Sequence, residues 1–264
     1  MKAAFDRVAK DYDAEFTFSE TGKLQRRHIL QYLDNKILNR GKLDILEINC
    51  GTGEDAIRFY KAGHSVLATD ISGEMIRVGR SKINSPDVSG IEFRQLSFTG
   101  LDYDLMKTKY DLVFSNFGGL NCVDKEDLLK IFSNINGILK PGGRFVGVIM
   151  PHYCLWEIIY FSYKRQWKRV FQRAEKKAVE VDLSGEKVAT WYYSPGQIRN
   201  LANKFKLRGI IPIGIFLPPS FLEKFFKKKK IFLNTLDIIE TILAHLPFLA
   251  SVSDHFLFDV ERTS

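Results

Sequence analysis

Glycine spacing in one short stretch constrains the fold more than any other feature of the sequence. The apolar run KLDILEIN at 42–49 continues into LEINCGTGEDA, which places Gly51, Gly53 and Ala56 in a G-x-G-x-x-A pattern. Such a pattern is typical of the first strand-to-helix turn of an α/β fold, where glycines let the backbone approach a ligand closely. The question is which ligand this turn holds.

Apolar runs alternate with helical patterns along the chain. Five runs predict strands, at 42–49, 65–71, 91–97, 109–115 and 143–150. Helical periodicity starts near Gly53, Gly73 and Asp124 between them, which implies β-α-β crossovers. Apolar residues 207–217 and a final strand at 254–260 complete a doubly wound α/β fold with a mostly parallel, seven-stranded sheet.

Composition narrows the setting. The chain has 264 residues, of which 45% are hydrophobic, so it can bury a full core. Cys50, Cys122 and Cys154 form no CxxC pair, which favours a reducing cytoplasm, and no metal site is expected. No apolar run approaches the roughly 18 residues of a membrane-spanning helix, so we expect a soluble protein. The net charge of +8 suits an anionic partner without identifying one.

Acidic residues around the glycine turn argue against a dinucleotide. Glu47 precedes the turn, and Glu54 and Asp55 follow it. These three acids crowd a place where a pyrophosphate would need backbone amides, although acids in the first turn of a helix also simply stabilise its dipole. Glu47 stands on an apolar strand, so it requires a charged partner or a polar cleft. A ligand with an ammonium, a sulfonium and a ribose would suit this edge better.

The segment ILEINCGTGEDAIRFYKAGHSVLATDISGEMI resembles the first two motifs of the class I S-adenosylmethionine-dependent methyltransferases. YDLVFSNFGGLNCV and LKPGGRFVGVIMP resemble their later motifs, and the likeness covers residues 1–150. The resemblance implies S-adenosylmethionine as cofactor and S-adenosylhomocysteine as product. It implies a cofactor-binding core with an N-terminal helical segment (1–150), a cap insertion (151–193), a continuation of the core (194–217), a second cap insertion (218–250) and a final core strand (251–264).

The same resemblance assigns residues to the cofactor. The methionine part would lie against Glu47, Gly51, Thr52 and Gly53, the ribose on Asp70, and the adenine between Ile71 and Met75. Ser97 stands where the family usually has an acid for the adenine amino group, a departure, and Phe98 follows it. Asn116 would lie beside the methyl donor, and Tyr12 would close over the cofactor or simply pack its helix.

Methyl transfer asks mainly for alignment, and a base only where the acceptor must lose a proton. His152 and Tyr153, in MPHYCLWE directly after the fifth strand, are the candidate catalytic residues, with His28 a further histidine to consider. A structural role for a lone histidine is the competing interpretation.

The insertions should shape the acceptor pocket. Aromatic residues recur at helical spacing between 153 and 173, opposite basic residues, which predicts one amphipathic helix. The second insertion combines aromatics with lysines 227–230, so peripheral membrane contact through 218–250 competes with a solvated turn between cap helices.

The preferred function is methyl transfer to a small, apolar or aromatic acceptor. Nucleic acid is not favoured as substrate, because SNFG replaces the Asn/Asp-Pro-Pro-aromatic box of base-amino methylation and no RNA-binding module is present. An NAD-dependent oxidoreductase using the same loop and a non-catalytic S-adenosylmethionine-binding protein remain the alternatives. The oligomeric state is left open.

Overall fold

The computed structural model describes residues 2–83, 89–99, 109–226 and 229–263. Its main sheet has seven strands in the order β3-β2-β1-β4-β5-β9-β8. In chain order these strands are β1 (Asp44–Ile48), β2 (Ser65–Asp70), β3 (Ile91–Gln95), β4 (Tyr110–Ser115), β5 (Leu139–Ile149), β8 (Phe205–Ile213) and β9 (His255–Arg262). All neighbours pair in parallel except β9, which runs antiparallel to both β5 and β8. The doubly wound, mostly parallel sheet predicted from the sequence is therefore confirmed.

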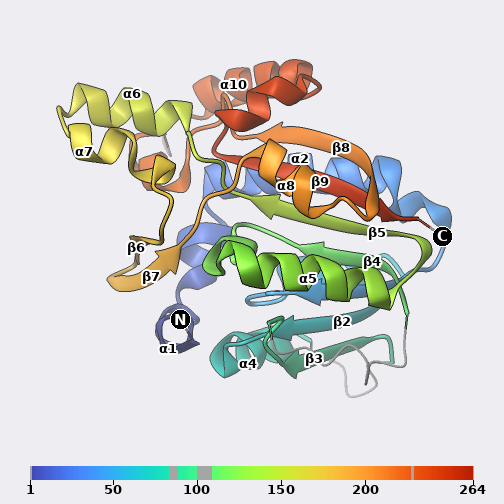
Figure 1. Ribbon diagram of the computed structural model, residues 1–264. Coiled ribbons are helices and arrows are strands. Elements are labelled where there is room, and N and C mark those ends of the chain that lie inside the picture. Colours follow the sequence, from blue (N-terminus) through green and yellow to red (C-terminus); the bar gives the residue numbers. More distant parts are fainter. Residues whose placement is uncertain (1, 84–88, 100–108, 227–228, 264) are drawn as a thin grey trace.

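Helices cover both faces of this sheet (Figure 1). The core helices are α1 (Lys2–Val8), α2 (Glu20–Lys36), α3 (Glu54–Lys61), α4 (Gly73–Ser81), α5 (Lys125–Ile138) and α8 (Pro195–Leu201). Apolar residues of α2, α3 and α4 join one core cluster with the sheet, and those of α5 and α8 join another. Helix α8 begins with Ser194 as N-cap in a capping box and Pro195 at the first helical position.

The segment 153–173 is not one helix, so that prediction is wrong. It contains α6 (Leu155–Tyr163), α7 (Trp167–Val170) and the 3₁₀ turn η4 (Gln172–Ala174). The break falls at Arg165, whose φ of 56° lies in the left-handed region and stops a right-handed helix. A two-stranded hairpin of β6 (Val179–Leu183) and β7 (Glu186–Thr190), which sequence periodicity did not reveal, completes this insertion.

The second insertion is helical and starts at the same edge as the first. It contains the 3₁₀ turn η5 (Ser220–Leu222), α9 (Glu223–Phe226), α10 (Lys230–Leu243) and the 3₁₀ turn η6 (Pro247–Ser251). Strands β5 and β8 both run antiparallel to β9, so they run parallel to each other and end at one edge. Both insertions therefore leave from the carboxyl edge of the parallel strands (Figure 1). Within the described ranges, no helix is long and apolar enough to cross a membrane.

An aromatic cluster lies at the centre of the core on the sheet face that α5 and α8 cover. Phe132, Phe145 and Phe258 are fully buried, and their ring centroids lie 5.1 to 5.5 Å apart. They join α5, β5 and β9, so this cluster fixes the antiparallel strand against the parallel part of the sheet. Rings at these distances add attraction beyond the area they bury.

We expect Phe258→Ala to lower the free energy of unfolding by about 3–5 kcal/mol, because it opens a cavity at the centre of this cluster. Urea titration followed by circular dichroism measures the loss. Leu129→Ala on the solvent side of α5, where the side chain is 53% exposed, is the matched control and should change little. Equal losses in the two variants would contradict the assignment of this cluster as core.

Candidate functional site

The glycine turn after β1 is fixed by the end of β2. Gly51 and Gly53 have φ angles of 54° and 77°, a left-handed conformation that favours glycine. The Gly51 N–H donates to Asp70 Oδ2 at 2.9 Å, and the Ser72 N–H donates to Asp70 Oδ1 at 2.8 Å. Burial raises the pKa of Asp70, and these two backbone N–H groups oppose that shift. One carboxylate thus joins two neighbouring strand ends.

A small cavity of about 90 Å³ opens at this edge. Its walls come from the N-terminal segment, the glycine turn, the end of β2 and the loops after β3 and β4. The lining residues are Phe5, Tyr12, Asn49, Gly51, Asp70, Ile71, Met75, Phe98, Asn116, Phe117, Gly118, Gly119 and Cys122. The cavity is polar at Asp70 and Asn116 and otherwise mostly apolar.

Seven residues assigned from the sequence share this cavity, namely Tyr12, Gly51, Asp70, Ile71, Met75, Phe98 and Asn116. Glu47, Thr52, Gly53 and Ser97 do not line it. Thr52 is buried and its hydroxyl donates to Asp13 Oδ1, so it anchors the N-terminal segment. The Ser97 hydroxyl pairs with that of Thr99 at 2.7 Å. Burial, opposed by Arg26, raises the pKa of Tyr12 to about 12, so its hydroxyl keeps its proton at neutral pH.

Behind the cavity wall lies a buried network of charges. Asp55 Oδ2 accepts from Asn116 Nδ2 at 2.7 Å and lies 2.6 Å from Arg26 Nη1. Glu47 is 2% exposed. Burial and the Asp55 carboxylate raise the pKa of Glu47 well above its ordinary range, while Arg26 acts against them. Among the described residues, Glu47 Oε2, Asp55 Oδ1 and Arg26 Nε have no hydrogen-bond partner.

The sequence left two roles open for the acids after the glycine turn, and the structure separates them. Glu54 pairs with Lys82 at 2.6 Å on the partly exposed side of α3, which is a stabilising surface role. Asp55 instead points into the buried network and orients Asn116. Adjacent acids therefore differ because successive helical positions face different sides.

The candidate catalytic residues stand apart from the cavity. His152 Nδ1 lies 3.0 Å from the Arg173 carbonyl oxygen, and its Nε2 lies 2.9 Å from Gln197 Oε1. Tyr153 is 43% exposed and does not line the cavity. His28 Nε2 lies 2.9 Å from Asp237 Oδ1. The structure thus brings seven of the eleven predicted cofactor residues together and gives His152 and His28 other partners.

Several residues at the site escaped sequence reasoning. Asn49 accepts from the Ser115 hydroxyl at 2.7 Å and donates to the Asn116 carbonyl at 3.2 Å, which ties β1 to β4. Phe117 has a φ of 42°, and its ring lies between the Arg26 guanidinium, 5.1 Å away, and the His255 ring, 5.6 Å away. The SNFGG stretch was a signal for Phe117, whereas nothing in the sequence linked Arg26 or His255 to it.

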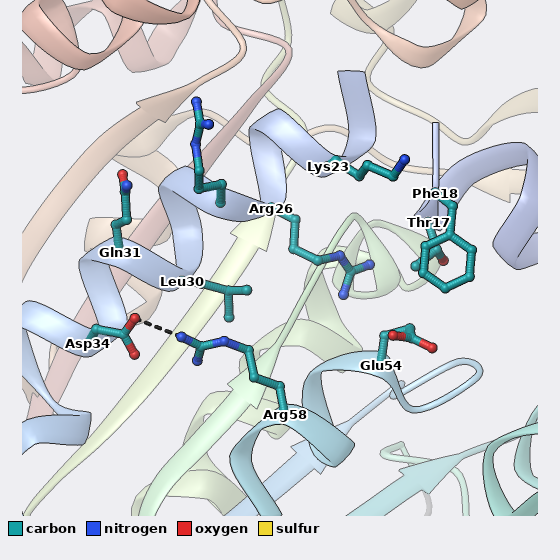
Figure 2. Close-up of a pocket in the computed structure, with 10 residues that line it drawn as sticks. Thr17, Phe18, Lys23, Arg26, Leu30, Gln31, Asp34, Glu54 and Arg58 are labelled. Atoms are coloured by element: carbon teal, nitrogen blue, oxygen red, sulfur yellow. Dashed lines mark hydrogen bonds and ion pairs between the residues drawn. The ribbon is translucent and has the colours of Figure 1, made fainter. Parts of the chain in front are cut away.

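A second cavity, of about 320 Å³, lies between α2 and α3. Figure 2 shows Lys23, Arg26 and Leu30 extending from α2, and Glu54 and Arg58 from α3. Its basic residues are largely paired, for example Arg58 with Asp34 at 2.7 Å. Arg26 lines this cavity and also contacts Phe117 in the wall of the smaller one, so its side chain stands between the two. Only the smaller cavity lies at the strand ends with Asp70.

The residues present fit the cofactor that the resemblance implies. The glycine turn presents backbone to the cavity, since a Cβ on Gly51 would come within 3.9 Å of Tyr12. Asp70 offers carboxylate oxygens to the cavity, whereas the unpaired oxygens of Glu47 and Asp55 lie buried behind its wall. Ligand pockets usually measure about 300–1,000 Å³, so the cavity as it stands is smaller than a cofactor of this size needs.

Comparison with known proteins agrees with this geometry. A family model described as a methyltransferase domain matches residues 45–143. The ubiquinone/menaquinone biosynthesis C-methyltransferase of Acidiphilium cryptum is 30% identical over 172 residues, which are 60% of this chain and 66% of that protein. The enzyme of the same name from Pseudomonas fluorescens is 34% identical over 168 residues, which are 60% of this chain and 62% of that protein. This chain thus spans somewhat less than two thirds of either relative.

Solved structures share the fold over nearly the whole chain. An S-adenosylmethionine-dependent methyltransferase from Clostridium acetobutylicum superposes with a TM-score of 0.61 at 14% identity, covering 98% of this chain and 99% of that one. At this identity the likeness shows that the two chains share the fold.

We expect Glu47→Gln to raise the stability of the ligand-free protein at neutral pH. The folded state holds the Glu47 proton to a higher pH than the unfolded state, so the parent loses stability as the pH rises above the ordinary value of 4.5. The variant lacks this loss, so the difference in free energy of unfolding between variant and parent should widen from pH 4.5 to pH 8. Urea titrations across this range measure it. A gap that narrows with rising pH would show that Glu47 is a stabilised carboxylate.

Proposed function

We propose that the chain is a class I S-adenosylmethionine-dependent methyltransferase that methylates a small, apolar or aromatic acceptor by direct in-line transfer. The observation that carries the proposal is the cavity at the strand ends, where Asp70 and the glycine turn meet an apolar wall. S-adenosylmethionine supplies a methyl group already activated on a sulfonium.

The residues of the chain would bind the cofactor and the acceptor, orient them toward each other and exclude water. We assign the ribose hydroxyls to Asp70, whose carboxylate is held by two backbone N–H groups and keeps further lone pairs for a ligand. Ile71, Met75 and Phe98 form the apolar wall for the adenine. Asn116 is fixed by Asp55 at the end of β4, where the donor and acceptor would meet. Rigid placement is the main contribution that this chemistry asks for.

The apolar character of the acceptor rests on two supports. Beyond Asn116 the cavity wall continues with Phe117 and Cys122, which offer no charge to a polar acceptor. The names of the two relatives from Acidiphilium cryptum and Pseudomonas fluorescens refer to ubiquinone and menaquinone biosynthesis. A reduced quinone, an electron-rich aromatic ring with hydroxyl groups, is therefore the first acceptor class to test. An NAD-dependent reaction is not favoured, because three acids surround the glycine turn.

We place the protein in the cytoplasm. Cys50, Cys122 and Cys154 are free and buried, so they depend on no oxidising environment. The methyl donor is a small charged molecule that this setting would supply.

Methyl transfer from labelled S-adenosylmethionine tests the acceptor class. We expect label to enter reduced naphthoquinones and benzoquinones that carry an unsubstituted ring position, and not transfer RNA or peptides offered at the same concentration. Mass spectrometry locates the added methyl group. Preferential labelling of the nucleic acid would overturn the proposed acceptor while leaving the methyltransferase assignment in place.

We expect Asp70→Ala to weaken S-adenosylmethionine binding about 10- to 100-fold, because hydrogen bonds to a charged group contribute roughly 1.5–3 kcal/mol. Calorimetric titration measures the dissociation constant, with S-adenosylhomocysteine and NADH as comparison ligands. Asp111→Ala is the matched control, since Asp111 pairs with Lys140 at 2.8 Å on β4, away from the cavity. An unchanged constant for Asp70→Ala would remove the ribose assignment.

His152→Ala separates the two roles considered for this histidine. Both ring nitrogens have partners in the protein, so we expect a loss of about 1–3 kcal/mol in stability and an unchanged pH profile of turnover. If His152 acts as a base, the slope of the turnover rate against pH at low pH should instead change when the imidazole is removed. His255→Phe, which alters the histidine beside Phe117, is the companion variant.

A further inference from the structure

The two insertions form one continuous cap on the carboxyl edge. Aromatic rings join them: Tyr160 of α6 contacts Phe221 at 5.5 Å, and Trp156 contacts Phe226 at 5.7 Å. Phe226 in turn stacks on Phe232 of α10 at 5.7 Å. Figure 1 shows α6, α7 and α10 together on one side of the molecule. Segments more than 60 residues apart in the sequence thus build a single surface.

This cap has large apolar side chains on its outside as well as its inside. Tyr163 is 82% exposed, Trp167 66% and Ile231 85%. We call the exposed apolar side chains of the cap the docking face, which comprises Leu155, Ile159, Tyr163, Trp167, Phe171, Phe221, Phe225, Ile231, Phe232, Ile238, Ile242 and Phe248. Monomeric proteins rarely leave so many large apolar groups of neighbouring elements in water.

Helix α10 buries Leu233 and Glu240 on one face and leaves an apolar stripe exposed. Its acids point inward, where Glu240 accepts from the backbone N–H groups of residues 214–217 and Asp237 pairs with His28 of α2. Its isoleucines at 231, 238 and 242 follow the spacing of one helical stripe and face outward. A helix that tethers itself through buried acids does not need this stripe for its own packing, so the stripe is available to a partner.

The exposed charges within 155–170 and 220–249 have one sign, and the first exposed acid beyond Phe171 is Glu175. In 155–170 and 220–249 the acids are Glu157, Glu223, Asp237 and Glu240, and each pairs with a group of the protein. The exposed charged side chains that the structure describes there are all basic: Lys164, Arg165, Lys168, Arg169, Lys224, Lys229 and Lys230. Lys227 and Lys228 complete the lysine run in the sequence and lie outside the described residues. A protein partner would normally meet both signs, whereas an anionic bilayer presents one.

We propose that the docking face binds peripherally to an anionic lipid bilayer. The isoleucines and phenylalanines enter the acyl boundary, Tyr163 and Trp167 lie at the headgroup level, and the lysines and arginines meet lipid phosphates. The insertions that carry the docking face start at the same sheet edge as the cofactor cavity, so docking would bring the acceptor entrance against the membrane. The proposal stands on the cap alone and does not depend on the identity of the acceptor.

Vesicle flotation of the full chain tests it, with phosphatidylcholine vesicles and with vesicles that also contain phosphatidylglycerol. We expect binding to the anionic vesicles, falling with added salt, and a shift of Trp167 emission to shorter wavelength that Trp167→Phe removes. The basic variant, Lys164→Ser with Lys168→Ser, Lys229→Ser and Lys230→Ser, should lose about fivefold in affinity for each lysine removed. The apolar variant, Ile231→Ser with Ile238→Ser and Ile242→Ser, should lose binding to the anionic vesicles.

The matched control combines Lys125→Ser, Leu129→Ser and Lys130→Ser on the exposed side of α5, which removes similar side chains from another surface. It should bind vesicles like the parent. All variants should keep S-adenosylmethionine affinity, which checks their folding and separates this proposal from the proposed function. Equal vesicle binding by the control and the docking-face variants would overturn the proposal. A second result would also overturn it: the parent does not bind vesicles but forms a dimer, and the apolar variant is a monomer. A second copy of the chain would then be the occupant of the docking face.

Discussion

Parallel strand pairing is the constraint on which the rest of the structure depends. Because β1, β2 and β4 run in one direction, their ends meet at one edge, and the side chains that follow them meet there too. Asp70 after β2 fixes the glycine turn after β1, and Asn49 ties that turn to Asn116 after β4. Three loops far apart in the sequence thus form one surface. Strand direction brings them together, and the contacts between the loops are not needed to specify the fold.

Buried charge behind this surface carries a cost that the fold itself does not explain. Glu47 and Asp55 are nearly fully buried, and Arg26 is the cation that balances them. Unpaired oxygens remain on both acids, and an unmade hydrogen bond to a buried charged group costs more than the roughly 1–3 kcal/mol of a neutral one. These oxygens lie behind the cavity wall and not in it, so the unmade hydrogen bonds are a cost held beside the site. Strained backbone at Phe117 lies in the same wall and fits the same logic.

Periodicity predicted the sheet, since it is a local property of the chain. Seven of the residues that the resemblance assigned to the cofactor line the cavity, and those directly after β1, β2 and β4 meet there because the edge rule depends only on strand direction. Sequence reasoning failed where partners come from distant elements. The two nitrogens of His152 are taken by Arg173 and Gln197, and Arg26 reaches the site from α2. The expected helix at 153–173 failed at Arg165, because periodicity does not detect one residue in a left-handed conformation.

Polarity of α10 shows why a sequence pattern alone could not settle what the cap does. An isoleucine stripe usually marks the inner face of a helix, and from the sequence either face could have been the buried one. The acids decide the matter, since Glu240 satisfies four backbone N–H groups at the end of β8 and can do so only from the inside. With Glu240 and Leu233 fixed on the inner face, Ile231, Ile238 and Ile242 lie on the opposite, exposed side. The apolar surface is therefore a consequence of how the cap is tethered to the core, and its position at the carboxyl edge is set by where β5 and β8 end.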